Sequence, residues 1–157
     1  MAPNDCYTAA LRILNYRFNS EAELRRKLKR KAYDAETVDA TIARLRSEKW
    51  LDDERFAAAF TRSRVSRRVG RRRIARELEA AGVGADAISR AIAENVDADG
   101  EREAIEKLCA RRIESLVRRH GRDYAMSEEG RQKIVATLLR SGFETSLVLE
   151  VIRAKVR

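Results

Sequence analysis

An internal repeat constrains the fold of this chain more than any other feature of its sequence. Six positions keep their character when 50 is added to each residue number, and again when a further 60 is added. In the first copy these positions are Leu24, Leu28, Ala32, Tyr33, Val38 and Ile42. In the second they are Ile74, Leu78, Gly82, Val83, Ile88 and Ile92, and in the third Ile134, Leu138, Gly142, Phe143, Val148 and Ile152. Two apolar stripes and the turn between them therefore occur three times without an internal gap.

Each copy has the spacing of two helices joined by a tight turn. Leu24 and Leu28 stand four residues apart, so they lie on one face of a helix. Ser20 precedes this stripe, and Glu23 stands three residues after Ser20, which is the pattern of a capping box. In the second copy the helix-ending position is Gly82, and glycine is the preferred residue just beyond a helix C-terminus. The pattern predicts a helix, a turn and a helix in every copy.

A further helix precedes each of these pairs. Apolar stripes predict these helices over residues 6–17, 53–67 and 101–119, and residues 120–127 form an insertion before the last pair. The offsets of 50 and 60 residues do not hold for the first helix of each copy, because these three helices differ in length. The predicted fold is all-α, with three tandem three-helix repeats stacked into an elongated, curved rod. The predicted repeats span residues 1–50, 51–95 and 96–157.

The composition favours a polyanionic partner. The 157 residues include 34 Lys or Arg and 25 Asp or Glu, which gives a formal net charge of +9. Such a basic balance is typical of proteins that bind nucleic acid. Hydrophobic residues make up 44% of the chain, so the chain can still bury a core.

Arginines are concentrated in the first two repeats. Several stand four residues apart, the spacing at which two like charges on a helix cost about 0.2–0.5 kcal/mol per pair. These pairs are Arg26 with Arg30, Arg64 with Arg68, and Arg72 with Arg76. A repeated cost of this kind indicates a bound anion, and a face that is merely solvated is the alternative. The predicted residues for binding nucleic acid or a partner are Arg26, Arg30, Arg64, Arg67, Arg68, Arg72 and Arg76.

Few side chains are suited to catalysis or metal binding. Cys6 and Cys109 lie far apart without a CxxC pattern, and we expect both to be small buried residues. His120 is the only histidine, and we expect it on the surface or at a helix end, because a catalytic base needs a positioned partner. The acidic run at residues 52–54 fits a helix N-terminus better than the magnesium site of a nuclease. We therefore expect no enzyme activity, no cofactor and no metal.

The aromatic residues and the apolar runs support two further expectations. Phe18 is assigned to the apolar stripe of the first helix, and Trp50, Phe56 and Phe60 to the core or to packing between repeats. Stacking on nucleic-acid bases is the alternative for these last three. No apolar run reaches the length of a membrane span, and residues 1–5 are too short for a signal sequence. The expected location is the cytoplasm, without a membrane partner.

The central part of the chain resembles the signature of the RecX family of regulatory proteins. The resemblance rests on residues 51–57 (LDDERFA), Gly70, residues 73–78 (RIAREL) and Gly82. Two flanking segments resemble the first-repeat and C-terminal motifs of the family, namely residues 20–28 (SEAELRRKL) and 140–143 (RSGF). The resemblance covers nearly the whole chain in the right order.

This resemblance implies a function that composition does not. Members of the family bind the RecA recombinase, chiefly the filament that RecA forms on single-stranded DNA. They lie in the filament groove, suppress its ATP hydrolysis and strand exchange, bind DNA and have no catalytic site. The expected partners are RecA, the RecA–DNA filament, and single-stranded and double-stranded DNA, with the chain itself a monomer. The alternative is a stand-alone DNA-binding regulator, although the predicted third helices carry an inconsistent set of base-reading side chains.

Overall fold

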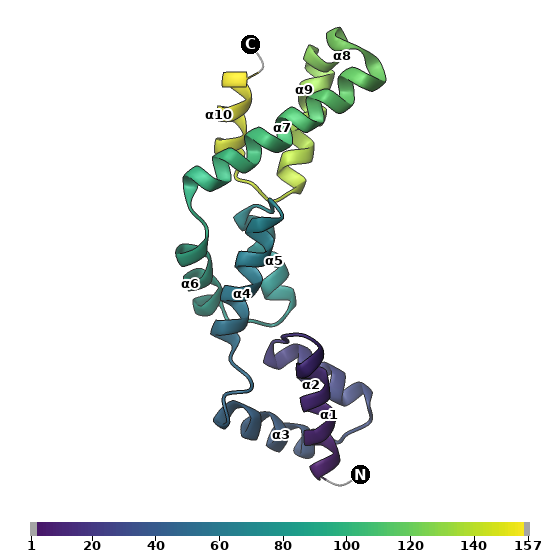
Figure 1. Ribbon diagram of the computed structural model, residues 1–157, viewed down its shortest axis with the longest axis vertical. Coiled ribbons are helices and arrows are strands. Elements are labelled where there is room, and N and C mark those ends of the chain that lie inside the picture. The colour runs from purple at the N-terminus through teal and green to yellow at the C-terminus, as the bar shows by residue number, and fades with distance from the viewer. Residues whose placement is uncertain (1–2, 156–157) are drawn as a thin grey trace. The chain divides into compact units, whose positions relative to one another are not determined.

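The structure, a computed structural model, describes residues 3–155, and every regular element in that range is an α-helix (Figure 1). The first five are α1 (Pro3–Tyr16), α2 (Glu21–Arg30), α3 (Ala35–Ser47), α4 (Asp53–Ser66) and α5 (Arg71–Ala80). The next five are α6 (Ala85–Asn95), α7 (Ala98–His120), α8 (Arg122–Met126), α9 (Glu128–Arg140) and α10 (Thr145–Lys155). The predicted all-α class is confirmed, and the repeated pairs are α2 with α3, α5 with α6, and α9 with α10.

The first helix of each repeat departs from its predicted range. The helix predicted over residues 6–17 begins at Pro3 and ends at Tyr16, and the one predicted over 101–119 begins at Ala98. The insertion predicted at residues 120–127 contains the short helix α8. His120 is exposed at the C-terminal end of α7, as predicted. None of the described helices is long and apolar enough to cross a membrane.

The chain divides into two compact units. One consists of the residues up to Phe60 together with Glu77–Ala91, and the other consists of Thr61–Arg76 together with the residues from Ile92 onward. The division passes within α4, α5 and α6, so these three helices contribute residues to both units. The rod shape and the boundaries of the three repeats stay predictions.

The core of the first unit lies where α1, α2 and α3 meet. Leu24 and Leu28 of α2 are fully buried, and burial of one such side chain stabilises the fold by about 1.5–3 kcal/mol. The predicted capping box is confirmed, since Ser20 Oγ accepts from the N–H of Glu23 at 3.1 Å and the Glu23 carboxylate accepts from the N–H of Ser20 at 3.3 Å. The buried members of this core are Cys6, Ala10, Leu24, Leu28, Val38, Ile42, Leu45 and Leu51.

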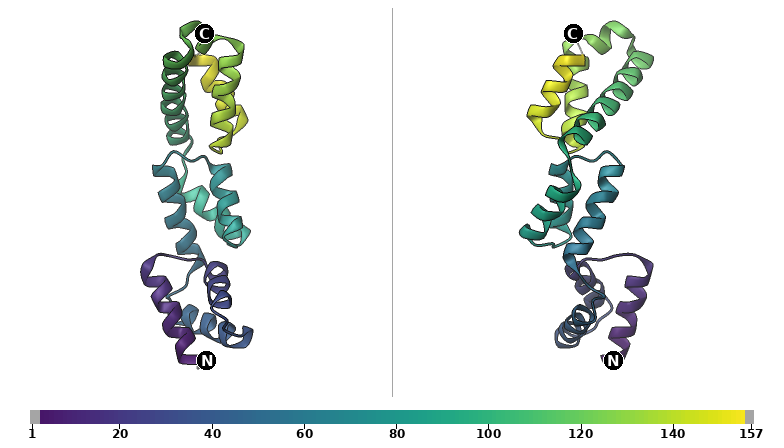
Figure 2. Two further views of the ribbon diagram at one scale, coloured as in Figure 1. Left: turned by 90° about the vertical axis from the view of Figure 1, so that its right-hand side faces the viewer. Right: turned by 60° about the vertical axis from the view of Figure 1, so that its left-hand side comes forward.

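The core of the second unit is formed mainly by α7, α9 and α10, which lie alongside one another in both views of Figure 2, and α8 adds Ala125 to it. Phe143 is its largest fully buried side chain. Both cysteines of the chain are buried and free, as predicted. The buried members of this core are Ile105, Cys109, Leu116, Ala125, Ile134, Leu138, Phe143, Val148, Val151 and Ile152.

In the second unit the C-terminal end of α9 meets the N-terminal end of α5. The N–H of Gly70 donates to the carbonyl oxygen of Ser141 at 2.8 Å, and the N–H of Arg72 donates to that of Gly142 at 3.0 Å. Helix starts leave N–H groups and helix ends leave carbonyl groups without partners, so each end here satisfies the other. We call this contact the α9–α5 joint.

Glycine is required on both sides of the α9–α5 joint. Gly142 has a φ of +91°, which an L side chain rarely adopts, and a Cβ there would lie 2.6 Å from the backbone nitrogen of Arg73. A Cβ at Gly70 would overlap the backbone of Gly142 and Phe143. Any larger residue at either position would push the two helix ends apart.

The first unit contains a related joint between the C-terminal end of α5 and the N-terminal end of α2. The hydroxyl of Ser20, the N-cap of α2, donates to the carbonyl oxygen of Ala81, which directly follows α5. Gly82 lies so close to Ala22 that a Cβ at Gly82 would overlap its side chain. The repeat offsets relate this α5–α2 joint to the α9–α5 joint, so the sequence repeat includes the way in which successive middle helices meet.

Two aromatic residues contradict their predicted positions. Phe56 is 5% exposed and its ring centroid lies 5.8 Å from that of Phe60, as expected for packing residues. Trp50, however, is 51% exposed, because it lies in the turn between α3 and α4, where Leu51 takes the buried position. Phe18 is 57% exposed, because α1 ends at Tyr16 and Phe18 is not on the helix face.

Candidate nucleic-acid and partner interface

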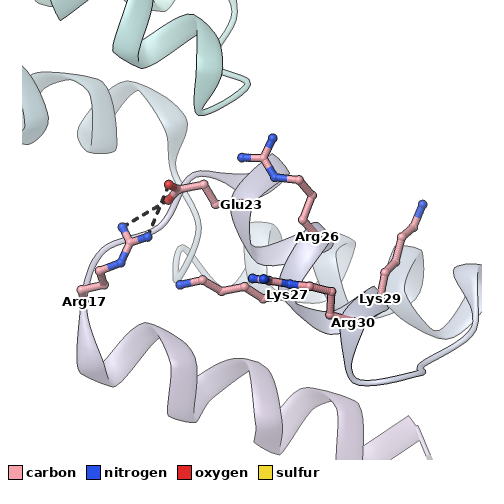
Figure 3. A pocket seen from close by; sticks show the side chains of 6 residues that line it. All are labelled: Arg17, Glu23, Arg26, Lys27, Lys29 and Arg30. Atoms are coloured by element: carbon pink, nitrogen blue, oxygen red, sulfur yellow. Dashed lines mark hydrogen bonds and ion pairs between the residues drawn. The ribbon is translucent and has the colours of Figure 1, made fainter.

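A basic pocket lies along α2 in the first unit (Figure 3). It has a volume of about 480 Å³ and is lined by five cationic side chains and one carboxylate. Its lining residues are Arg17, Glu23, Arg26, Lys27, Lys29 and Arg30. Arg17 comes from the segment that follows α1, whereas the others belong to α2. The excess of cations makes this pocket attractive to anions.

Local contacts orient two of these cations. The guanidinium of Arg17 forms an ion pair with the Glu23 carboxylate at 3.3 Å, drawn as dashed lines in Figure 3. Nζ of Lys27 donates to Oδ1 of Asn19 at 2.6 Å, and Asn19 is itself buried. Burial lowers the pKa of Lys27, and the nearby positive charge of Arg17 acts in the same direction. Arg17 and Lys27 are therefore held in place before any ligand binds.

Arg26 and Arg30 are both exposed on α2. The guanidinium nitrogens of Arg26 lie 3.4 Å from the carbonyl oxygen of Ala80, the last residue of α5. The C-terminal end of a helix carries partial negative charge, so a cation is favourable there. Arg26 thus supports the α5–α2 joint, a structural role that its sequence position did not indicate. In the described part of the chain, no carboxylate pairs with Arg30.

Arg72 and Arg76 lie in the second unit, on α5. Both are exposed, whereas Ile74 between them is fully buried, so the two arginines face away from the core as their spacing predicts. Neither forms an ion pair with a carboxylate within residues 3–155. Together they present an uncompensated positive face.

The predicted pairing of Arg64 with Arg68 is wrong. The helix α4 ends at Ser66, and Arg68 adopts a φ of +58° in the turn that follows. In that turn the N–H of Val69 donates to the carbonyl oxygen of Arg64 at 3.1 Å. Arg64 and Arg68 therefore do not share a helical face. Arg67 is exposed, whereas the other two are half-buried.

The structure brings only some of the predicted residues together. It places Arg26 and Arg30 at one pocket and Arg72 and Arg76 on one helix face, and the two pairs belong to different units. The prediction did not include three other cations of the α2 pocket. Two of them, Lys27 and Lys29, stand in the same basic run as Arg26, which was the available signal. The third, Arg17, has no such signal, because its position depends on the path of the segment between α1 and α2.

The acidic run at residues 52–54 acts at helix N-termini, as predicted. Oδ1 of Asp52 accepts from the N–H of Arg55 at 3.0 Å and caps α4. Oδ1 of Asp53 accepts from the N–H of Glu21 at 2.8 Å, so this carboxylate caps α2 instead. Among the residues that the structure describes, no group of three or more His, Cys, Asp or Glu side chains is arranged to hold a metal ion.

Comparisons with known proteins agree on one family. The family model "RecX, first three-helix domain" matches residues 6–45, and "RecX, second three-helix domain" matches residues 52–92. "Regulatory protein RecX" of Oceanobacillus iheyensis is 32% identical over 152 residues, which cover 94% of this chain and 52% of that protein. "Regulatory protein RecX" of Xanthomonas campestris pv. campestris is 35% identical over 135 residues, which cover 86% of this chain and 78% of that protein. This chain thus spans about half the length of the first relative and over three quarters of the second.

A solved structure shares the fold. The crystal structure of RecX from Lactobacillus salivarius matches with a TM-score of 0.80 at 22% sequence identity. The match covers 97% of this chain and 95% of that one. This likeness extends the agreement from the sequence to the arrangement of the helices.

Proposed function

The chain belongs to the RecX family, and from this premise we propose that it is a regulatory protein that binds RecA and the filament that RecA forms on single-stranded DNA. In this proposal it acts in the cytoplasm, inhibits the ATPase and strand-exchange activities of the filament, and so modulates recombinational DNA repair. It acts by binding, as a monomer and without a catalytic site of its own. Membership of the family is the observation that carries the proposal.

The distribution of positive charge supports this proposal. The first unit carries the α2 pocket and the second carries the Arg72 and Arg76 face. A filament of identical protomers on DNA offers the same sites repeatedly, so two basic surfaces on one chain can engage two sites at once. Linked contacts gain affinity because the second binding event is intramolecular. Their attraction to phosphate also makes binding dependent on salt.

The proposal is tested by measuring ATP hydrolysis by RecA on single-stranded DNA. We expect hydrolysis to fall when this protein is added at well below one copy per RecA protomer, because each bound copy blocks a site in a cooperative filament. Strand exchange should fall over the same range. If hydrolysis is unchanged even at equimolar protein, the proposed function is wrong.

A second candidate is a stand-alone helical DNA-binding regulator. The net charge of +9 and the three-helix domains favour it, since such domains can place a helix in the major groove. This candidate predicts sequence-dependent binding to double-stranded DNA without RecA and no effect on RecA hydrolysis. The ATPase measurement therefore separates the two.

A further inference from the structure

We propose that Tyr16, Phe18 and Trp50 form a platform on which unpaired nucleic-acid bases stack, while Arg17 and Arg55 bind the adjoining phosphates. This inference rests on the proposed function, because a filament on single-stranded DNA is the setting in which unpaired bases are met. The platform lies outside the set of arginines predicted from the sequence. It would bind the bases of the nucleic acid and not only its phosphate backbone.

The three rings form an exposed aromatic cluster in the first unit. Tyr16 is 91% exposed, Phe18 57% and Trp50 51%. Large apolar side chains gathered on a surface mark an interaction site more often than scattered ones do. The three line one hollow of about 510 Å³, whose full lining is Leu14, Asn15, Tyr16, Arg17, Phe18, Trp50 and Arg55. We call this set the aromatic hollow.

The backbone holds Trp50 on the surface. Lys49 has a φ of +61° in the turn that follows α3, and the N–H of Trp50 donates to the carbonyl oxygen of Leu45 at 2.9 Å. Leu51, the next residue, is 4% exposed and anchors the chain in the core. The backbone of Trp50 therefore lies between two fixed points, so binding does not have to order this part of the main chain first. A preorganised contact of this kind loses less entropy on binding.

The segment that carries Phe18 is held in a similar way. Asn19 is buried, and its side-chain amide donates to the carbonyl oxygen of Arg17 at 2.7 Å and accepts from Nζ of Lys27 at 2.6 Å. The guanidinium of Arg55 lies 5.5 Å from the centroid of the Phe18 ring, within the range of a cation–π contact. The aromatic hollow thus has fixed walls from two different turns of the chain.

The charges around the aromatic hollow favour nucleic acid as the occupant. Arg17 and Arg55 stand at its edge, and within residues 3–155 no carboxylate pairs with the guanidinium of Arg55. Single-stranded nucleic acid combines flat apolar bases with phosphates, and proteins bind it with aromatic rings set beside a positive groove. An apolar face on a partner protein would cover the rings but leave Arg55 without an anion. A strand satisfies both features at once.

The chain has a built-in probe for this inference, because Trp50 is its only tryptophan. We would titrate the protein, without RecA, with a thymidine oligonucleotide of about 12 nucleotides and with an abasic oligonucleotide of the same length. Stacking should quench the fluorescence of Trp50 with the thymidine strand only. We expect the thymidine strand to bind on the order of tenfold more tightly than the abasic one.

Substitutions sharpen the test. Trp50→Leu and Phe18→Leu keep an apolar side chain but remove the ring, so each should weaken thymidine binding on the order of tenfold and leave abasic binding unchanged. Affinities would be measured by anisotropy of a labelled strand, with thermal melts to verify folding. Val65→Ala is the matched control, since Val65 is an exposed apolar side chain on α4 outside the aromatic hollow, and it should change neither affinity.

Two results would overturn the inference. One is equal affinity for the thymidine and abasic strands with unaltered Trp50 emission, which needs no variant and so does not depend on how a variant folds. The other is a Trp50→Leu variant that loses inhibition of RecA hydrolysis but keeps its affinity for thymidine, which would identify a protein as the occupant. Failure of the ATPase experiment with intact thymidine stacking would count against the proposed function alone.

Discussion

The carboxylate of Glu101 binds Arg71, the first residue of α5, through both of its oxygens. Oε1 accepts a hydrogen bond from the backbone N–H of Arg71 at 3.0 Å, and Oε2 accepts one from Nε–H of the same residue at 2.6 Å. Glu101 lies in the first turn of α7 and is only 6% exposed. Asp53, in the first turn of α4, accepts the backbone N–H of Glu21 in the corresponding way. In each unit an acidic residue of one helix therefore caps the middle helix of the preceding repeat, by accepting an N–H group that this helix leaves without a partner.

Glu101→Ala should lower the free energy of unfolding by about 2–3 kcal/mol, because it leaves a charged, partly buried hydrogen-bonding group of Arg71 without a partner. Glu101→Gln keeps one acceptor and should cost less. Urea unfolding followed by circular dichroism would measure both. The control is Glu103→Ala, which removes an exposed ion pair with Lys107 and should change stability by less than about 1 kcal/mol. Equal losses at positions 101 and 103 would contradict the assigned role.

Asp53→Asn should keep the cap and remove a charge that burial disfavours. Burial raises the pKa of the Asp53 carboxyl above its usual value, while the hydrogen bond from Glu21 and the charge of Arg46 oppose this shift. A raised pKa means that the folded protein binds the proton more tightly than the unfolded chain does. The resulting stabilisation is complete below the unfolded pKa of about 3.9 and is lost as the pH rises through the folded pKa.

The amide side chain of the Asp53→Asn variant carries no charge at any pH. Its advantage in stability over the natural carboxyl should therefore appear only as the pH rises above about 4, where the carboxyl loses its proton. We expect the variant to be as stable as the natural protein or more stable at pH 7, and the difference to decline as the pH falls toward about 4. Chemical unfolding at several pH values would measure it. If the stability difference between the variant and the natural protein grows as the pH falls, the pKa of Asp53 is lowered rather than raised in the folded protein.

Ala32→Gly should stabilise the protein by about 1 kcal/mol. Ala32 has a φ of +65° at the position where the later repeats have Gly82 and Gly142, and the left-handed region is unfavourable for a residue with a Cβ. The matched control is Ala40→Gly on the exposed side of α3, where the same change should cost about 1 kcal/mol. The same sign at both sites in thermal unfolding would refute this account of Ala32.

Gly142→Ala should lower the free energy of unfolding by about 3 kcal/mol. The new Cβ would strain a backbone with a φ of +91° and collide with Arg73 across the α9–α5 joint. Gly84→Ala is the control, because a Cβ at Gly84 meets no other atom within 4 Å. That change should cost no more than about 1 kcal/mol, because Gly84 is the N-cap of α6, where alanine is less favourable than glycine. A small effect at Gly142, comparable to that at Gly84, would show that the joint yields easily.

The elements that could be predicted from the sequence are those whose signal is local. The periodicity around Leu24 and Leu28 and the capping box at Ser20 located α2, and the repeat then located the corresponding helices in the other copies. The α9–α5 joint could not be predicted from the sequence. Gly70 looks there like an ordinary N-cap residue, and its contact with Gly142 joins residues that lie far apart in the chain. Glu101 was missed for the same reason.

The errors in the candidate site arise where the chain ends a helix without the usual marker. Lys49 and Arg68 both adopt positive φ in the turns that follow α3 and α4, although neither is glycine, so no glycine marks these two turns in the sequence. Arg68 was paired with Arg64 on its four-residue spacing alone, although it lies beyond the helix predicted over residues 53–67. Trp50 was assigned to the core or to packing between repeats, with base stacking as the alternative, but it lies exposed in the turn that follows α3.

Neutralising Arg72 and Arg76 tests whether the exposed face of α5 binds phosphate. The double variant Arg72→Gln, Arg76→Gln should bind single-stranded DNA more weakly. Each lost phosphate contact should reduce the slope of log affinity against log salt by about 0.7 on single strands, so the slope should be less steep by about 1.4. The control is Arg90→Gln, Arg102→Gln, which removes the same charge from two arginines that already pair with carboxylates and should leave the slope unchanged. Titrations at four or more salt concentrations, on the order of 50–200 mM, would measure both slopes. If the Arg72 and Arg76 variant keeps the natural slope, this face is only solvated and the phosphate contacts lie elsewhere.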